Sequence, residues 1–547
     1  MTMAPAPFET HEVLNQPPPL VDYDLFGTDR ALKEAVVREG ADWAMDELGS
    51  FGRKLGSAET IEAGRLANAY PPVPRLFDRY GRRIDEVEFH PAWHELMGLA
   101  IGEGLHTRPW AEPRPGAHVA RAAGVIMMVQ IEAGVQCPTT MTYGVVPALK
   151  KAPAIAAEWL PRLYSRQYDK RMIPAPEKTG VLMGMGMTEK QGGSDLRANM
   201  TRATPAGDAY RLDGHKWFFS APMCDAFLVL AQAPGGLSCF FLPRFLPDGS
   251  RNALHVQRLK DKLGNKANAS SEVEFHGATA WLVGEEGRGV PTIIEMGNYT
   301  RLDCALGSTG LMRQAVAQAS HHAAHRSAFQ KRLIDQPLMT NVLADLAIES
   351  EAATALVLRL ARAYDAQEDP AETAFRRMLT PAAKYWICKR GPALGAEAME
   401  VLGGNGYVEE AIMARLYREL PLNSIWEGSG NVMCLDVLRA LAKTPEALDV
   451  ALAEIQTARG ADRRLDAHVT ALTDEVARDG FQESQARRLV ERLVLALQGA
   501  LLVRHGDAAV ANGFCASRLA SSQSGAFGTL PQGIDIRAIA ERTRPAI

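Results

Sequence analysis

The chain has 547 residues, and its composition is that of an ordinary globular protein. Hydrophobic residues make up 47% and charged residues 23% of the sequence, which is too apolar for intrinsic disorder. The 60 basic and 64 acidic side chains give a formal net charge of −4. This balance excludes a uniformly basic protein that coats nucleic acid, although it allows a local basic patch. At ~150 residues per domain, the length predicts three or four structural units.

The seven cysteines are widely scattered, and no two of them form a C-x-x-C pair. This odd, dispersed set predicts neither a disulfide framework nor a metal site, and it favours a reducing cytoplasmic compartment. No run of ~18 apolar residues occurs, so no membrane span is expected. The first residues contain prolines and Glu9 without an apolar core, which is not typical of a signal peptide.

In chain order, residues 1 to about 30 are expected to form an extended arm, because Pro17, Pro18 and Pro19 prevent regular structure there. From Arg30 to about Tyr168 the pattern is helical, with Pro-rich breaks between the apolar stretches. We therefore predict an N-terminal helical domain with an extended arm over residues 1–180.

The sequence becomes Gly-rich and strand-like after Gly180 and remains so until Gly289. Short apolar or alternating runs are typical of strands, and Tyr210–Trp217 resembles a hairpin that turns on Asp213-Gly214. We predict a compact β domain over residues 181–289, inserted between helical blocks.

Helical periodicity returns after Pro291, which predicts a second helical domain over residues 290–442. A break in the helical pattern at Lys443-Thr444-Pro445 predicts a linker, and a C-terminal helical domain is predicted over residues 443–547. Leucines four residues apart in this tail indicate core or subunit packing rather than a membrane face. The stripe consists of Leu489, Leu493, Leu497 and Leu501. The fold class is thus α+β, mostly α.

A Gly-rich segment, Met185–Asp195, is the densest candidate for a binding site. Glycines let backbone amides approach an anion closely, and Thr188 and Ser194 add hydroxyl donors. A phosphate or a flavin carbonyl would suit such a loop. The alternative is an ordinary Gly-rich turn between two elements.

An aromatic segment, His215–Pro222, is the second candidate. Its three consecutive aromatic residues place rings on both faces of a strand. A planar cofactor could lie against one face, with the Ser220 hydroxyl at its edge. Core packing is the alternative explanation for such a run.

The third candidate is the segment Ile425–Asn431, in which Glu427 lies between a tryptophan and a glycine. A carboxylate in such surroundings is partly desolvated, which raises its pKa toward the working range of a general base. The alternative is a surface glutamate in a helix-capping turn.

In this order and spacing, the three segments resemble those of the acyl-CoA dehydrogenase superfamily of flavoproteins, over residues 30–442. Longer runs, among them Gly236–Phe241, Arg258–Asn265 and Asn423–Asn431, and the tail beyond residue 442 are similar to its AidB-like branch of alkylation-response flavoproteins. The resemblance implies the acyl-CoA dehydrogenase fold, with a helical domain, a β domain and a helical bundle, plus an extra C-terminal helical domain.

The resemblance also implies FAD as the cofactor. Arg326 would reach the FAD of a neighbouring subunit, as would the Gly403–Tyr407 segment, so a homotetramer is expected. Phe218 departs from the family, where most members carry tryptophan, and Gln330 stands where a glycine is usual. The implied cofactor-binding residues are Met185, Met187, Thr188, Gly193, Ser194, Phe218, Phe219, Ser220, Ala221, Arg326, Gln336, Gly403, Gly404, Ser424, Ile425, Trp426, Gly428, Ser429 and Asn431.

The family comparison implies Glu427 as the catalytic base, which removes the α-proton of an acyl thioester while hydride passes to the flavin. Some relatives place the base just before an arginine on another helix, but Thr300 precedes Arg301 here and cannot serve. Arg301 is a second candidate catalytic residue that lines the same cavity, or else a structural ion-pair partner.

In AidB-like proteins the extra domain is associated with binding of double-stranded DNA. Binding would require arginines on one face, and the alternative is that each is paired with a neighbouring carboxylate. The candidate DNA contacts are Arg439, Arg487, Arg488, Arg492, Arg504 and Arg518.

The resemblance as a whole implies a cytoplasmic, FAD-containing, DNA-binding flavoprotein of the alkylation damage response. It would protect DNA or inactivate alkylating agents, with weak dehydrogenase activity toward short branched thioesters such as isovaleryl-CoA. Two rivals remain: a metabolic short- or branched-chain acyl-CoA dehydrogenase with no DNA role, and a DNA-shielding protein in which FAD is only structural. Nitroalkane-type oxidation is a more distant option, because relatives of that kind use Asp as the base.

Overall fold

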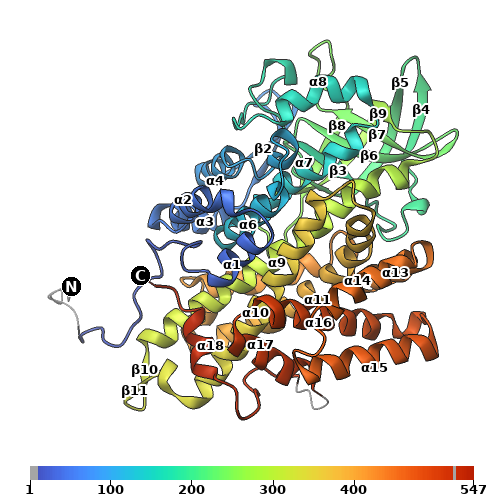
Figure 1. Cartoon of the computed structure of the whole chain (residues 1–547). Coiled ribbons are helices and arrows are strands. Elements are labelled where there is room, and N and C mark those ends of the chain that lie inside the picture. The colour runs from blue at the N-terminus through green and yellow to red at the C-terminus, as the bar shows by residue number, and fades with distance from the viewer. Residues whose placement is uncertain (1–9, 521–524, 547) are drawn as a thin grey trace.

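A computed structural model describes residues 10–520 and 525–546, and residues 1–9, which belong to the predicted arm, lie outside the described part. A β region lies between two groups of helices, and a third group of helices follows toward the C-terminus (Figure 1). The chain is thus mostly helical with one sheet region, as the sequence predicts. Among the described residues, no helix is both long enough and apolar enough to cross a membrane.

The N-terminal region is built from short helices that pack around α6 and α7. Its helices are α1 (Arg30–Arg38), α2 (Met45–Leu55), α3 (Ala58–Ala69), α4 (Pro91–Gly102), α5 (Arg108–Ala111), α6 (Ala117–Ile131), α7 (Gln136–Leu149) and α8 (Pro153–Leu163). Every residue of α6 is buried. Because α6 is buried on all sides, it lies at the centre of the region rather than on its surface.

An antiparallel hairpin interrupts these helices, so the helical pattern predicted from Arg30 to about Tyr168 does not hold over this segment, where only Pro-rich breaks were expected. Its strands are β1 (Val73–Phe77) and β2 (Arg83–Glu88). Both strands are too polar to give a clear strand pattern. The hairpin is held instead by contacts distant in sequence, because Asp85 accepts a 2.9 Å hydrogen bond from the backbone N–H of Val256.

The β region is a seven-stranded sheet whose pairings close into a ring. Its strands are β3 (Met183–Gly186), β4 (Arg202–Ala206), β5 (Ala209–Ser220), β6 (Ala226–Ala233), β7 (Gly236–Pro243), β8 (Leu254–Leu259) and β9 (Ser270–Val283). Strands β6, β7, β9, β5 and β4 pair in turn, and β4 returns to β6. Strand β3 adds to β6 in parallel, and β8 adds to β9. Closing the sheet leaves few open edges.

The predicted turn at Asp213-Gly214 is wrong, because β5 runs straight through this pair. The sheet register shifts between Leu212 and Asp213, so the pair forms a bulge rather than a hairpin turn. Gly214 has φ +151°, and a Cβ atom there would lie 2.6 Å from the Thr201 hydroxyl oxygen. The hairpin turns earlier, at Gly207-Asp208, where Gly207 has φ +71°.

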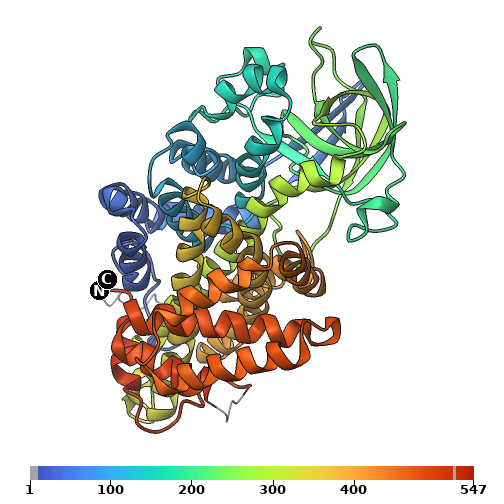
Figure 2. The same cartoon turned by 45° about the vertical axis from the view of Figure 1, so that its right-hand side comes forward.

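Three long α-helices and two shorter ones form the second helical region, and α9 runs from the β ring into this bundle (Figure 2). The helices are α9 (Gly289–His325), α10 (Pro337–Asp365), α11 (Pro370–Val401), α12 (Ile412–Glu419) and α13 (Gly430–Lys443). A two-residue hairpin of β10 (Ser327–Ala328) and β11 (Lys331–Arg332) lies between α9 and α10. The α9 residues between Tyr299 and Ala317 are all buried, so this helix is the axis of the core.

The C-terminal helices pack against α10, α11 and α13 rather than standing apart. They are α14 (Glu446–Gln456), α15 (Arg463–Asp479), α16 (Ala486–His505), α17 (Ala508–Phe514) and α18 (Ile536–Arg542), with a π-helical turn at Cys515–Leu519. The leucine stripe of α16 is buried, and Leu497 is fully inaccessible to solvent. The stripe therefore packs in the core, as predicted.

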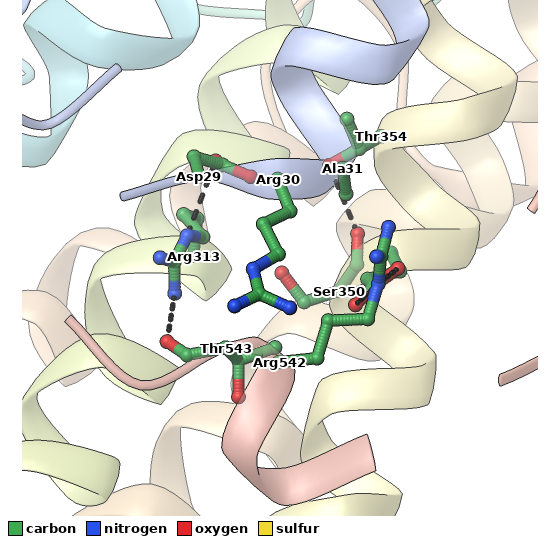
Figure 3. A pocket seen from close by; sticks show the side chains of 9 residues that line it. Asp29, Arg30, Ala31, Arg313, Ser350, Thr354, Arg542 and Thr543 are labelled. Atoms are coloured by element: carbon green, nitrogen blue, oxygen red, sulfur yellow. Dashed lines mark hydrogen bonds and ion pairs between the residues drawn. The ribbon is translucent and has the colours of Figure 1, made fainter. Parts of the chain in front are cut away.

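The last helix, α18, is anchored to α1, α9 and α10 through a small polar pocket (Figure 3). Arg313 donates to the carbonyl oxygen of Thr543 at 3.1 Å and forms an ion pair with Asp29. Arg542 donates to the buried Glu351 carboxylate at 3.0 Å. These charge-assisted bonds tie both ends of the described chain to the middle of the bundle.

We propose that the changes between helical and strand-like sequence patterns mark the domain boundaries, which gives the domains 1–180, 181–289, 290–442 and 443–547. Helices and strands begin or end close to each proposed boundary: β3 begins at Met183, α9 at Gly289 and α14 at Glu446.

Candidate active site and flavin cradle

Glu427 lies in a tight turn between the short helix Leu422–Ser424 and the start of α13. Its backbone has φ +58°, and the following Gly428 has φ +109°. Such left-handed geometry is costly for a non-glycine residue and persists only where surrounding contacts enforce it. The Thr300 hydroxyl of α9 donates a 2.6 Å hydrogen bond to Oε2 of Glu427, so the carboxylate is held against α9.

The electrostatic surroundings of Glu427 suit a general base. Burial raises the pKa of this carboxyl group above its ordinary value. The hydrogen bond from Thr300 and the positive charges of Arg301 and Lys384 act in the opposite direction. A desolvated carboxylate with a raised pKa is a better proton acceptor than an ordinary surface glutamate.

Arg301 acts as a clamp on the backbone of this turn. Its Nε donates to the carbonyl oxygen of Glu427 at 3.1 Å, and its Nη1 donates to Asp436 at 2.8 Å. Its side chain is only 8% exposed. Asp436 also accepts from Arg377 at 2.9 Å. This geometry favours the structural ion-pair interpretation of Arg301 over a direct catalytic one.

A fully buried ion pair organises the Gly-rich loop that carries Thr188 and Ser194. Lys216 Nζ donates to Glu189 Oε1 at 2.7 Å, and neither side chain is exposed. Glu189 also accepts from the backbone N–H of Met200 at 2.6 Å. Although burial disfavours the carboxylate, the Lys216 ammonium holds the pKa of Glu189 at about 2. Burial lowers the pKa of Lys216 to about 8. The pair thus remains charged at neutral pH and fixes the loop.

Lys216→Met is expected to weaken FAD binding at least tenfold, because the buried Glu189 carboxylate loses its counter-ion and the loop loses its anchor. The measurement is the ratio of bound flavin to protein after dialysis. Lys190→Met is the matched control, because Lys190 is exposed on the same loop. Equal flavin retention in both variants would contradict the assigned role.

The aromatic segment of β5 divides between the surface and the core. Phe218 is 51% exposed, whereas Phe219 is fully buried with its ring centroid 4.4 Å from that of Phe227. Because neighbouring side chains on a strand point to opposite faces, the Phe219 ring packs inside the β ring. Phe219 is one of the predicted cofactor-binding residues, and its side chain is taken up by core packing. Ala221 is also buried and has φ +53°.

Polar groups near these segments are available to hold a flavin. Within residues 10–520 and 525–546, the hydroxyls of Thr188, Ser194 and Ser429 form no hydrogen bond. The amide nitrogen and oxygen of Asn268, which is 1% exposed, also form none there. The Cys137 thiol contacts both Asn268 and Ser220. Orphaned donors and acceptors of this kind fit the carbonyls, nitrogens and phosphates of FAD.

The segment around Ser429 also suits an anion, since α13 begins there without a side-chain cap. Ser424, Ile425, Trp426 and Gly428 lie in the same turn as Glu427. Trp426 Nε1 donates to Asn423 at 2.8 Å, and Ser424 donates to the carbonyl oxygen of Cys388 at 3.2 Å. The hydrogen bond to Asn423 fixes the nitrogen edge of the Trp426 ring against the preceding short helix.

The residues predicted to serve a neighbouring subunit lie at the other end of α9. Arg326 follows the last residue of this helix, ~36 Å along its axis from Arg301. Its Nη1 donates to the carbonyl oxygen of Asn15 at 2.5 Å, and Gln336 donates to that of Ala328 at 3.0 Å. Gly403 and Gly404 are exposed. One chain therefore does not bring these four residues to its own Glu427.

The predicted DNA-contact arginines fall into two groups. Arg518 donates to Asp345 at 2.6 Å, and Arg492 forms an ion pair with Glu475. Their charges are thus balanced inside the fold. The remaining four, Arg439, Arg487, Arg488 and Arg504, are exposed. Of these, Arg488 pairs with Glu475, Arg504 lies 3.9 Å from Glu454, and Arg487 donates to Asn431 at 2.8 Å.

Several residues of the site were not identified from the sequence. Lys384, Asp436 and Asn268 carry no motif of their own, and only packing brings them to the turn at Glu427 or to Ser220. Glu189 and Lys216 lie within the segments that were singled out, but their spacing gave no sign of an ion pair. The strand of Lys216 also carries Arg211, Asp213 and His215, so this lysine did not stand out in the sequence as a buried charge.

Comparisons with known proteins agree with this arrangement. Three family descriptions match: the adaptive response protein AidB N-terminal domain over residues 15–170, the acyl-CoA dehydrogenase middle domain over 184–278 and its C-terminal domain over 287–442. The chain is 51% identical over 511 residues to AidB of Escherichia coli (strain K12), covering 93% of this chain and 94% of that protein. The chain belongs to the AidB-like branch of the acyl-CoA dehydrogenase family.

Other acyl-CoA dehydrogenases share its sequence or fold. Acyl-CoA dehydrogenase family member 11 of Caenorhabditis elegans is 30% identical, covering 88% of this chain and 84% of that protein. The solved structure of C. elegans ACDH-11 in complex with C11-CoA matches with TM-score 0.84 and 26% identity, covering 99% of this chain and 93% of that one. A Bacillus anthracis acyl-CoA dehydrogenase complexed with FAD shares the fold, with TM-score 0.60, 19% identity and coverage of 78% and 77%. The protein is accordingly an FAD-dependent oxidoreductase of the acyl-CoA dehydrogenase type.

Proposed function

We propose that this protein removes the α-proton of an acyl-CoA thioester with Glu427 as the base. The observation that carries the proposal is the half-buried Glu427 carboxylate, which Thr300 orients and whose backbone carbonyl oxygen accepts a hydrogen bond from Arg301. When bound, FAD accepts the hydride equivalent from the neighbouring carbon. The chain holds the carboxylate in one orientation through the hydrogen bond from Thr300, so the base is positioned before the substrate arrives.

An acyl thioester is supported as the substrate class by the C11-CoA complex of C. elegans ACDH-11. The test is the visible spectrum of the purified holoprotein, mixed anaerobically with isovaleryl-CoA and, separately, with a long-chain acyl-CoA. Loss of the oxidised-flavin absorbance with either thioester is expected. A yellow protein that neither thioester bleaches would reject the dehydrogenase proposal and favour structural FAD.

We further propose that the protein binds double-stranded DNA and takes part in the response to alkylation damage. Its 51% identity to AidB supports this proposal. So do the exposed arginines of α13 and α16, because a guanidinium that is not buried in an ion pair is available to phosphate. The opposite reading, a metabolic dehydrogenase without a DNA role, is favoured by the internal pairing of Arg492 and Arg518.

Arg439→Ala is expected to weaken DNA binding and to lower the slope of log affinity against log salt by about 1, since one phosphate contact is lost. Gel shifts with a random-sequence duplex over a range of salt concentrations measure both quantities. Arg478→Ala is the control, because Arg478 is 70% exposed but paired with its neighbour Asp479. An unchanged slope in Arg439→Ala, or equal effects of the two substitutions, would remove this surface from the proposal.

We also propose a homotetramer, because Arg326, Gln336, Gly403 and Gly404 lie too far from Glu427 of their own chain to join its flavin site. Sedimentation of the holoprotein tests this assembly. A monomer that retains FAD would contradict it.

A further inference from the structure

Lys384 is a buried cation directly beneath the turn that carries Glu427. It lies on α11 and is 1% exposed. Its Nζ donates a 2.6 Å hydrogen bond to the carbonyl oxygen of Gly428. Because removing an ammonium group from water costs several kcal/mol, such a residue is expected to compensate a charge or to fix a strained segment.

Two buried cations hold two successive carbonyl oxygens of this turn. Arg301 Nε donates to the carbonyl oxygen of Glu427, and Lys384 Nζ donates to that of Gly428. Both residues of the turn have positive φ. The two bonds therefore fix the backbone in a conformation that Glu427 would otherwise avoid, and they leave its carboxylate free for the contact with Thr300.

The two cations differ in how their charges are balanced. Arg301 forms an ion pair with Asp436, which also receives Arg377. Within the described residues 10–520 and 525–546, Lys384 has no carboxylate within ion-pair distance. The positive charges of Arg301 and Lys384 both favour the ionised form of Glu427, but that of Arg301 is also shared with Asp436.

The other titratable groups that face Glu427 are thiols. Cys137 approaches from α7 and Cys304 from α9. Burial raises the pKa of Cys137 to about 11 and that of Cys304 well above its ordinary value. Both thiols are therefore neutral at neutral pH and add no charge beside Glu427.

We infer that Lys384 is a positioning residue for the base: it fixes the Glu427–Gly428 turn and supplies the positive charge that keeps Glu427 ionised until it receives the substrate proton. The inference rests on the proposed function. It assigns the ionised state of the base to a residue on a different helix, 43 positions earlier in the sequence. Thr300 then sets the direction of the carboxylate, and Lys384 sets its charge.

The test compares three substitutions in the holoprotein. Lys384→Met removes the charge and the donor, Lys384→Gln removes the charge but keeps a donor for Gly428, and Lys384→Arg keeps both. Lys389→Met is the matched control, since Lys389 is exposed on the same helix. Two readouts are followed against pH: the rate of flavin reduction by acyl-CoA, and the carboxyl stretching band that Glu427→Gln removes from the infrared spectrum.

In Lys384→Met and Lys384→Gln, the midpoints of both pH profiles are expected to move up by at least ~1 unit, because a positive charge that favours the ionised carboxylate is lost. The rate at neutral pH should fall about tenfold, with partial recovery at high pH. Lys384→Arg should restore the wild-type midpoint, and Lys389→Met should not change it.

A wild-type midpoint in Lys384→Gln, with only a lower rate, would overturn the electrostatic role. If Lys384→Met does not fold, the Gln and Arg variants still decide the question. If the wild-type flavin is not bleached by any acyl-CoA, the proposed function fails. The infrared titration would still report whether Lys384 controls the ionisation of Glu427.

Discussion

Glu427→Gln is expected to lower the rate of flavin reduction by acyl-CoA by ~10³–10⁴-fold, because glutamine cannot accept the substrate proton. The amide is nearly isosteric with the carboxylate, and it can still accept the hydrogen bond from Thr300. The turn, the clamp by Arg301 and the bound FAD should therefore be retained. The measurement is anaerobic stopped-flow absorbance with the thioester that bleaches the wild-type protein.

The matched control is Glu410→Gln, which alters an exposed glutamate outside the site. It should reduce its flavin at the wild-type rate. The visible spectrum of oxidised Glu427→Gln should match that of the wild type, which shows that the flavin site is intact. A Glu427→Gln protein that is bleached as fast as the wild type would exclude this residue as the base.

Arg121→Met is expected to lower the free energy of unfolding by about 3–5 kcal/mol, since it leaves a buried charge without its partner. Arg121 of α6 donates to both carboxylate oxygens of Asp303 on α9, at 2.7 and 2.6 Å. Both side chains are 1% exposed. Arg121 also donates to the carbonyl oxygen of Leu105 at 2.6 Å. The residue thus joins the N-terminal helices to the central helix of the bundle.

Urea unfolding of the holoprotein, followed by circular dichroism, measures this loss. Arg53→Met is the control, because its ion pair with Asp24 is on the surface, where such pairs contribute about 0–1 kcal/mol. The double variant Arg121→Met/Asp303→Leu should recover much of the lost stability, because no unpaired charge remains. Equal midpoints for Arg121→Met and Arg53→Met would show that the buried pair is not important for stability.

The sequence alone was enough to predict the family and the mostly helical fold, and it is the basis for proposing Glu427 as the base. These depend on local patterns: helical periodicity, a Gly-rich loop, and a glutamate between a tryptophan and a glycine. Each of these patterns can be recognised in the sequence because it is formed by residues that are close together in the chain. The buried leucine stripe of α16 is an example, since its spacing alone predicted a packed face.

The ion pairs and charged hydrogen bonds between distant residues became known only from the structure. The sequence could not place Lys384 under Gly428, pair Lys216 with Glu189, or bury Arg518 against Asp345, because each pair joins residues far apart in the chain. It also misplaced the turn at Asp213-Gly214, since the pairing of β5 with β9 makes a bulge there. Long-range electrostatics and sheet register arise from the packing of distant segments, and no local pattern encodes them.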